Sequence, residues 1–503
     1  MKSVTTGFLF RQAAVIVFLT AAGLSCNLCL PGKKKLILKL LLAFPLGLAL
    51  YAVTGFAVLL LGIPFNAYSM SILLFLVCLA VIVYSIRKGE CHKPDRDEAA
   101  KLAIFLVIAA AAALFCSSGI LSVTIDNDSV YYYSTYPEII AKTGKYLKYF
   151  DTFMTDVGQT SAVLNTLPFI YGFDNTFGIQ HFMNLNFLAL FVAAMVELLE
   201  GDSSNITADK VPIGRFRPSA VAAVLAALFM AGSYPFLFIS KWVMSNVYFM
   251  EYFCIILIVV LLGGEELRGF GFTLFVMIAM LSMLRVEGVV VCGVLALCLS
   301  SLKLSKKTLA SVFVLPVLIL QCGFYAMLYL RMGVDPVYSF LDVKKALAIT
   351  LSLAALLVYI LLIRDRMLKA EFIHRYYRMI IILVLLFGNI VFLAVNPDRY
   401  ISNLLTIYRN IRLGHGWGYF GIFMVIAAIF IAADILRSRF AKIEFLDFIW
   451  VCFILTVIAA CWARGGMLRM GVGDSGNRIM METVPLTVAV IAQKCYRLYR
   501  SWR

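Results

Sequence analysis

Long apolar runs alternate with short charged segments along the whole chain. An α-helix needs about 20 consecutive apolar residues to cross a bilayer, and about fifteen runs approach that length. They lie near residues 8–30, 36–62, 68–86, 102–123, 178–199, 217–239, 244–263, 270–284, 288–302, 309–330, 346–363, 379–396, 416–436, 445–463 and 479–493. The pattern predicts an all-α polytopic membrane protein with about 13 to 15 transmembrane helices.

One apolar stretch, 270–302, is interrupted by Arg285 and Glu287. If it were a single helix, every later loop would change sides and most downstream basic residues would lie outside. Cytoplasmic loops are normally enriched in Lys and Arg. We therefore expect two short helices, 270–284 and 288–302, that form a hairpin with its charged turn near the outer face.

The composition supports a membrane protein. Hydrophobic residues make up 62% of the chain and charged residues 14%, whereas about 25% of the residues in a soluble domain are charged. A net charge of +16 could indicate nucleic-acid binding in a soluble protein, but most of the 44 Lys and Arg fall in loops predicted to be cytoplasmic. Arg364 in one such loop and Lys494 in the basic C-terminal tail are examples. We therefore expect membrane lipids, and no nucleic acid, as partners of the basic residues.

The charges around the first run predict the orientation of the chain. Lys2 and Arg11 precede this run or lie at its start, and a denser cluster of lysines between 33 and 39 follows it. The N-terminus is therefore expected outside and the basic C-terminus in the cytoplasm. A cleaved signal peptide is the alternative, although the run is long and lacks an A-x-A-like cleavage site. The chain does not end in an ER-retention signal, which favours a bacterial inner membrane.

Three parts follow from this topology: N-terminal transmembrane helices (1–123), a large external loop (124–178) and a transmembrane bundle with short external loops (179–503). The large loop is rich in Tyr, Asp and Asn and contains two helix-compatible stretches, 130–141 and 160–171. Loops of this length without a function are uncommon.

Two carboxylates, Asp126 and Asp128, begin the large loop just after an apolar run and just before a cluster of tyrosines. A carboxylate at a partly desolvated interface has a raised pKa and can act as a general base. Either residue could instead cap the helix that begins near Ser129. A capping carboxylate has a second oxygen, so Asp128 could do both.

Several charged residues could bind an anionic or sugar substrate. Arg478 begins the last predicted span at the outer face, directly after a glycine-rich turn, 471–476. Its planar guanidinium suits a phosphate. The alternative is an arginine that snorkels to the interface. Arg285 and Glu287 could form an internal ion pair or bind phosphate or sugar. Arg399 lies in another charged external connection, 397–415.

Histidine and cysteine give weaker indications. His181 follows the large loop and could contact a substrate or a metal, although a histidine at an interface is more often a local hydrogen-bonding group. Cys26 and Cys29 form a CxxC motif without a second pair, which argues against a zinc or redox site.

The segment 125–181 resembles the GT-C class of glycosyltransferases. The resemblance rests on an Asp after an early span, an aromatic four residues later (Asp128 and Tyr132), a helix with Gly144 near its end, and a polar loop followed by many spans. The class takes sugars from polyprenyl-linked donors, with an Asp of the first large external loop as general base. The resemblance assigns this role to Asp128, or to Asp126 as the second candidate, and donor-phosphate binding to Arg478. It also makes Tyr132 a candidate substrate-binding residue. Three spans precede the loop here, whereas many members have one.

The resemblance thus implies a hexosyl- or pentosyltransferase that uses a polyprenyl-phosphate-sugar donor on the extracytoplasmic side. The acceptor could be a lipid-linked glycan, a wall polymer or a protein. No cofactor is certain, and a divalent cation stays open. The alternatives are a transporter or flippase of lipid-linked glycans and a polysaccharide polymerase or ligase. A membrane O-acyltransferase is disfavoured because no external histidine lies deep in an apolar run.

Overall fold

The computed structural model describes most of the chain: residues 6–29, 36–88, 95–118, 130–148, 158–201, 217–242, 245–263, 267, 269–333, 342–441, 443–463, 468–471 and 474–502. In these ranges the regular structure consists of helices, with no strand. Eleven of the helices described are long and apolar enough to cross a membrane, and a bent pair raises the number to twelve. The predicted class, an all-α polytopic membrane protein, is confirmed.

The number of candidate spans in the described part is lower than the predicted 13 to 15. Helices α15 (Gly271–Leu284) and α16 (Gly288–Leu299) fall short of the usual spanning length. The last apolar run is divided between α25 (Ser475–Met481) and α26 (Val484–Ser501), and neither helix is both long and apolar enough to cross a membrane. The predicted break at Arg285 and Glu287 is confirmed, whereas the hairpin geometry stays a prediction.

The chain forms two compact units, each built from separate stretches of sequence. The first comprises Met1–Leu190, Ser240–Val289 and Ser311–Leu351, and the second comprises Phe191–Ile239, Val290–Ala310 and Ser352–Arg503. The three-part division by membrane side is a different kind of division and stays a prediction.

The helices of the first unit are α1 (Thr6–Cys29), α2 (Leu36–Leu41), α3 (Ala43–Leu61), α4 (Ala67–Arg87), α5 (Arg96–Ser117), η1 (Tyr131–Thr135), α7 (Tyr136–Thr143), α9 (Gln159–Leu164), α10 (Leu167–Tyr171), the first half of α11 (Phe177–Gly201), α14 (Ser245–Gly263), α15, most of η4 (Leu309–Val314), α18 (Leu315–Tyr325), η5 (Ala326–Arg331) and the first half of α19 (Val343–Val358).

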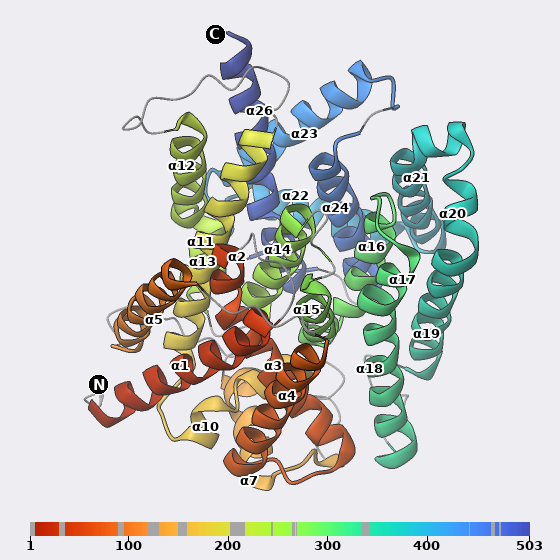
Figure 1. Cartoon of the computed structure of the whole chain (residues 1–503). Helices are drawn as coiled ribbons and strands as arrows, with labels where there is room; N and C mark the ends of the chain where they lie inside the picture. Colours follow the sequence, from red (N-terminus) through yellow and green to blue (C-terminus); the bar gives the residue numbers. More distant parts are fainter. Residues whose placement is uncertain are drawn as a thin grey trace. The chain divides into compact units, whose positions relative to one another are not determined.

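The second unit contains the rest of α11 and α19, α12 (Pro218–Gly232), α13 (Tyr234–Ser240), most of α16, α17 (Lys306–Thr308), η6 (Tyr359–Ile363), α20 (Arg364–Met367), α21 (Glu371–Val395), α22 (Pro397–Arg412), α23 (Phe420–Arg437), α24 (Phe445–Ala463), α25 and α26. Within it, α21 packs along α24, while α12 and α23 pack along α26 (Figure 1).

Glycines allow α1 and α3 to cross in close contact in the first unit (Figure 1). A Cβ atom added to Gly23 of α1 would collide with the backbone oxygen of Ala43, and one added to Gly47 of α3 would collide with that of Leu19. Small residues let helix backbones approach in this way where lipid supplies no hydrophobic driving force.

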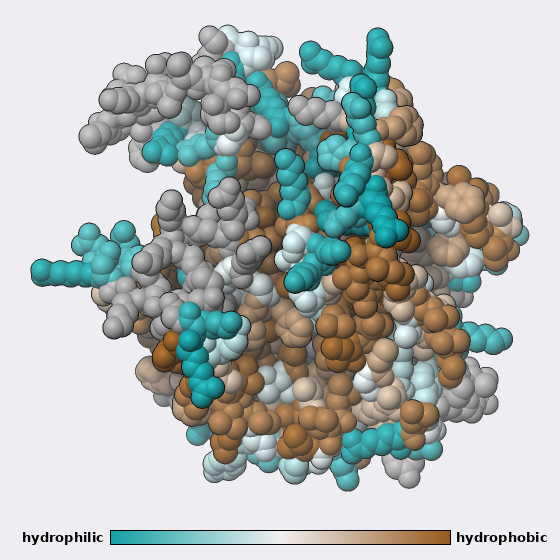
Figure 2. Space-filling view, turned by 45° about the vertical axis from the view of Figure 1, so that its right-hand side comes forward, coloured by the Kyte–Doolittle hydropathy of each residue, from teal (hydrophilic) through white to brown (hydrophobic). Residues whose placement is uncertain are grey.

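Large apolar side chains are exposed on several helices, as expected for a surface that faces lipid. Examples are Phe75 on α4, Val107 on α5 and Phe387 on α21. Figure 2 shows hydrophobic residues over much of the face in view, with many hydrophilic side chains near its upper end. The helix α22 occupies most of the predicted external connection 397–415, which the sequence did not predict to be helical.

Candidate functional site

The two predicted carboxylates, Asp126 and Asp128, lie outside the residues that the structure describes. Shortly after them the chain forms the π-helical turn η1, followed by α7, which ends at Gly144 with a left-handed φ of 70°. The helix expected over 130–141, with Gly144 near its end, is therefore confirmed. Whether Asp128 caps the helix or acts as a general base is therefore not tested by the structure.

A cluster of polar side chains connects this part of the loop to the break after α15. The Arg285 guanidinium donates from Nε to Glu287 Oε1 at 2.6 Å and from Nη1 to Ser245 Oγ at 3.3 Å. Ser245 Oγ also shares a hydrogen bond of 2.9 Å with the Tyr133 hydroxyl. The Arg285 and Glu287 side chains are each 9% exposed. Arg285 and Glu287 thus form the predicted ion pair, and hydroxyl groups tie it to η1.

The far end of the large loop also packs against this break. Thr160 Oγ1, in α9, donates to the backbone oxygen of Met280 at 3.0 Å. A Cβ atom on Gly158 would collide with the backbone oxygen of Leu284, so only glycine fits there. The Tyr136 hydroxyl donates to Gln159 Oε1 at 3.2 Å and joins the two described segments of the loop. The helical turn η1 and the start of α9 therefore lie against the break that contains Arg285.

Two buried tyrosines of the loop are neutral. Burial raises the pKa of the Tyr136 and Tyr146 hydroxyls above the ordinary value for tyrosine. Both phenols therefore stay protonated at physiological pH.

Two other predicted residues, Tyr132 and His181, belong to the same unit and are half-buried. Tyr132 is next to Tyr133 in η1, and His181 lies in the first turns of α11. Substrate binding by either residue stays a prediction. The sequence analysis did not single out Ser245, since nothing in its own segment indicates a bond to Arg285.

Arg478 belongs to the second unit and differs from its prediction. It was expected to open the last span, but it lies in the short helix α25, which ends before α26 begins. It is only 7% exposed. A snorkelling arginine keeps its charged end in water or among head groups, so this burial disfavours that alternative.

Asparagines of α22 hold the polypeptide just before α25. Asn403 Oδ1 accepts from the backbone nitrogen of Leu468 at 3.0 Å, and Asn410 Oδ1 accepts from that of Gly471 at 2.8 Å. Asp474 caps α25 by accepting from the backbone nitrogen of Asn477 at 3.0 Å. The glycine-rich turn is thus fixed by side chains wherever the structure describes it.

Asn477, the residue before Arg478, is equally constrained. Its Oδ1 accepts from Trp417 Nε1 at 2.7 Å, and its Nδ2 donates to the backbone oxygen of His415 at 2.9 Å. Asn477 and Trp417 are both buried. The sequence offered one overlooked signal for this arrangement: the seven-residue spacing of Asn403 and Asn410, which places both amides on one face of a helix.

Arg399 has a local partner. Its guanidinium carbon lies 4.9 Å from the centre of the Trp462 ring, and its Nη2 donates to the backbone oxygen of Trp462. These contacts fix the end of α24 and account for the position of the Arg399 side chain. A substrate-binding role for Arg399 stays a prediction.

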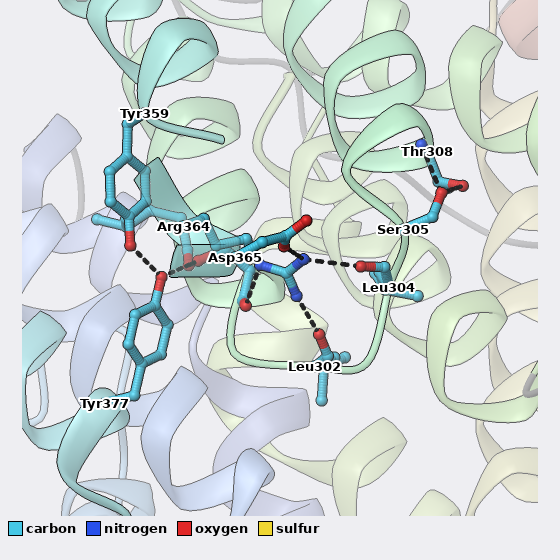
Figure 3. Close-up of polar contacts among 10 residues, drawn as sticks. Leu302, Leu304, Ser305, Thr308, Tyr359, Arg364, Asp365 and Tyr377 are labelled. Carbon is cyan, nitrogen blue, oxygen red and sulfur yellow. Dashed lines mark hydrogen bonds and ion pairs between the residues drawn. The ribbon is translucent and has the colours of Figure 1, made fainter. Parts of the chain in front are cut away.

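Arg364, taken from the sequence as an ordinary cytoplasmic charge, is a buried structural residue (Figure 3). It donates to the backbone oxygens of Ser300 at 2.9 Å, Leu302 at 2.6 Å and Leu304 at 2.9 Å. Beside it, Tyr377 shares hydrogen bonds with Tyr359 and with Ser300 Oγ. This network, the Arg364 network, fixes the segment that follows α16.

The divalent cation that the sequence leaves open stays a prediction. In the described ranges, no group of three or more His, Cys, Asp and Glu side chains could hold a metal ion. Cys26 is buried in α1, with its sulfur 3.8 Å from that of Cys78 in α4. The side chain of Cys29 lies outside the described residues.

Comparison with known proteins gives no match: no protein family, curated protein or solved structure is significantly similar to this chain. The fold and the candidate spans define a multi-pass membrane protein.

Proposed function

We propose that the chain is a membrane glycosyltransferase that moves a sugar from a polyprenyl-phosphate donor to an acceptor hydroxyl on the extracytoplasmic side. One observation supports this most: the Tyr133–Ser245–Arg285–Glu287 cluster. It joins the loop that contains Asp126 and Asp128 to a buried arginine more than a hundred residues away.

The proposed reaction needs a general base for the acceptor hydroxyl and a positive charge beside the departing phosphate. A carboxylate, Asp128 or else Asp126, takes the proton of the acceptor hydroxyl while the oxygen of that hydroxyl bonds to the sugar's anomeric carbon. The bond from that carbon to the phosphate oxygen breaks, and the phosphate leaves with the electron pair. Arg285 stabilises the developing negative charge, and Glu287 holds its guanidinium in position. Arg478 is a second candidate for phosphate binding.

The test is transfer from a radiolabelled polyprenyl-phosphate hexose or pentose in membrane vesicles that contain the full chain. Asp128→Asn keeps an oxygen for capping and removes the base, so transfer should fall by about 10²-fold or more. Asp126→Asn should lose less. Asp174→Asn, at an exposed residue after α10, is the matched control and should keep full activity. Near-normal transfer by Asp128→Asn would reject it as the base, and Asp126 would take its place.

A transporter or flippase of lipid-linked glycans is the second candidate, because Glu251 is buried in a candidate span and intramembrane carboxyls mark many transport pathways. In that case Asp128→Asn would leave translocation of a labelled lipid-linked glycan largely intact. A polysaccharide polymerase or ligase would transfer whole glycan chains and not single sugars, which the size of the labelled product reveals.

We further propose a bacterial inner membrane with the N-terminus outside and the C-terminus in the cytoplasm. A cysteine introduced at Lys145 should react with an impermeant reagent in intact cells, and one introduced at Ser501 should not. Equal labelling of both sites would contradict this topology.

A further inference from the structure

The helix α14 contains a buried glutamate that the proposed glycosyltransferase site does not use. Glu251 lies in the first half of α14 and is 0% exposed. The helix is one of those long and apolar enough to cross the membrane. A carboxylate in such a position has lost its hydration, which is strongly unfavourable unless other groups replace it.

The surroundings replace only part of that hydration. With its amide oriented so that the nitrogen faces Glu251, Asn184 of α11 donates to Glu251 Oε1 at 2.7 Å and to the backbone oxygen of Gln180 at 3.3 Å. Glu251 Oε2 has no hydrogen-bond partner among the described residues. Gln180 Oε1, also buried, likewise has none there.

Four of the helices that the structure describes, α3, α11, α14 and α15, contribute no Lys or Arg to the surroundings of Glu251. On α14 itself its neighbours are Tyr248 and Tyr252, and the Tyr252 hydroxyl donates to the backbone oxygen of Pro45 in α3. The only ionisable side chain of α3 is Tyr51, and α15, which packs against α14, has none. On α11, His181 precedes Asn184 by one turn.

We propose that Glu251 is a proton-binding site inside the membrane, which holds a hydrogen ion on Oε2 and, as a neutral carboxyl, connects α14 to Asn184 of α11. A neutral carboxyl removes the cost of an unpaired buried charge and still accepts from Asn184 through Oε1. The site needs neither sugar nor polyprenyl lipid, so the inference does not depend on the proposed function.

Infrared spectroscopy of the purified full chain in lipid vesicles tests the protonation directly. At about neutral pH, the wild type should show a protonated carboxyl C=O band that is absent from Glu251→Gln. Asn184→Leu keeps the carboxyl but removes the donor to Oε1, so the band should move to higher frequency. A wild-type spectrum identical to that of Glu251→Gln in this region would overturn the proposal. If Glu251→Gln does not fold, an unshifted band in Asn184→Leu overturns it.

Thermal unfolding over a pH series provides the second test. A glutamate in the unfolded chain loses its proton near pH 4.3, at about its reference pKa. If folded Glu251 keeps its proton above that pH, the folded state binds more protons, and stability falls as pH rises. From about pH 5 to about pH 8, the wild type should therefore lose thermal stability relative to Glu251→Gln. Glu138→Gln, at a partly exposed glutamate paired with Lys142, should keep the wild-type slope.

Sodium ions provide the competing explanation. The same unfolding experiment in sodium chloride and in choline chloride should give equal transition temperatures. A sodium-dependent stabilisation that disappears in Glu251→Gln would show that a metal ion, and not a proton, occupies the site. A wild type and a Glu251→Gln variant with the same pH dependence would also overturn the proposal.

Discussion

Two buried arginines, one on each side of α16 in the sequence, use their hydrogen-bond donors differently. Arg364 donates to three backbone oxygens, and its remaining partner is the neighbouring Asp365 (Figure 3). Arg285, in contrast, donates to two side chains, Glu287 and Ser245. Backbone oxygens stay in place when a ligand arrives, whereas side-chain partners can rotate. The Arg364 network therefore stabilises the fold, whereas the proposed function requires Arg285 to exchange a side-chain partner for a substrate phosphate.

The largest effect is expected from Arg364→Leu. It leaves the backbone oxygens of Ser300, Leu302 and Leu304 without their charged donor, at a cost on the order of 4 kcal/mol in unfolding free energy. Thermal unfolding in detergent should show a large fall in transition temperature. Arg366→Leu, two residues away at an exposed position, is the control and should change little. A stable Arg364→Leu variant would contradict the structural role.

Arg285→Lys should separate function from stability. Lysine keeps the charge but loses the planar fork, so sugar transfer should fall by about 10- to 100-fold while the unfolding temperature changes little. Arg364→Lys should do the opposite and lower stability. If Arg285→Lys lowered stability and spared transfer, the two arginines would not differ as proposed.

Arg478→Lys should weaken polyprenyl-phosphate binding by about 10-fold or more, because an arginine contact to phosphate is worth about 1.5 to 3 kcal/mol. Arg469→Lys, at an exposed position before the same helix, is the matched control. Binding of polyprenyl phosphate to the two purified variants provides the measurement. Unchanged affinity in Arg478→Lys would remove Arg478 from the donor site.

Tyr133→Phe should have the smallest effect, since it removes one neutral hydrogen bond to Ser245 worth about 1 kcal/mol. Transfer should fall by up to about fivefold if this bond positions the loop relative to Arg285. Tyr68→Phe, at an exposed position on α4, is the control and should transfer normally. Equal losses in both variants would show that the loss does not come from the Tyr133–Ser245 bond.

The helical class and the break at Arg285 and Glu287 could be predicted because both follow from local apolar periodicity and its interruption. The Arg285–Glu287 ion pair was one of two alternatives predicted for these residues, and binding of phosphate or sugar was the other. The bond from Arg285 to Ser245 could not be predicted, because it joins positions 40 residues apart. Only packing brings such positions together, and a single sequence does not specify it.

Charged residues were the least predictable. Lys494 was interpreted as part of a basic tail, but it is buried and pairs with Asp434 at 2.6 Å and with Asp447 at 2.8 Å. Arg364 is also buried, and its backbone partners lie 60 to 64 residues away in the sequence. The number of charges in a loop does not reveal such partners, which only packing brings together.

The glycine contact between α1 and α3 has a consequence for how the protein is made. Both helices are complete within the first 61 residues, whereas other stretches of the same unit come from residues after 239. Chains are synthesised from the N-terminus, so this pair can meet in the bilayer well before α14 and α15 exist. A larger side chain at Gly23 or Gly47 would then disturb the platform on which later helices assemble. The defect would arise during biogenesis and would reduce the yield of inserted protein, whatever the stability of the molecules that mature.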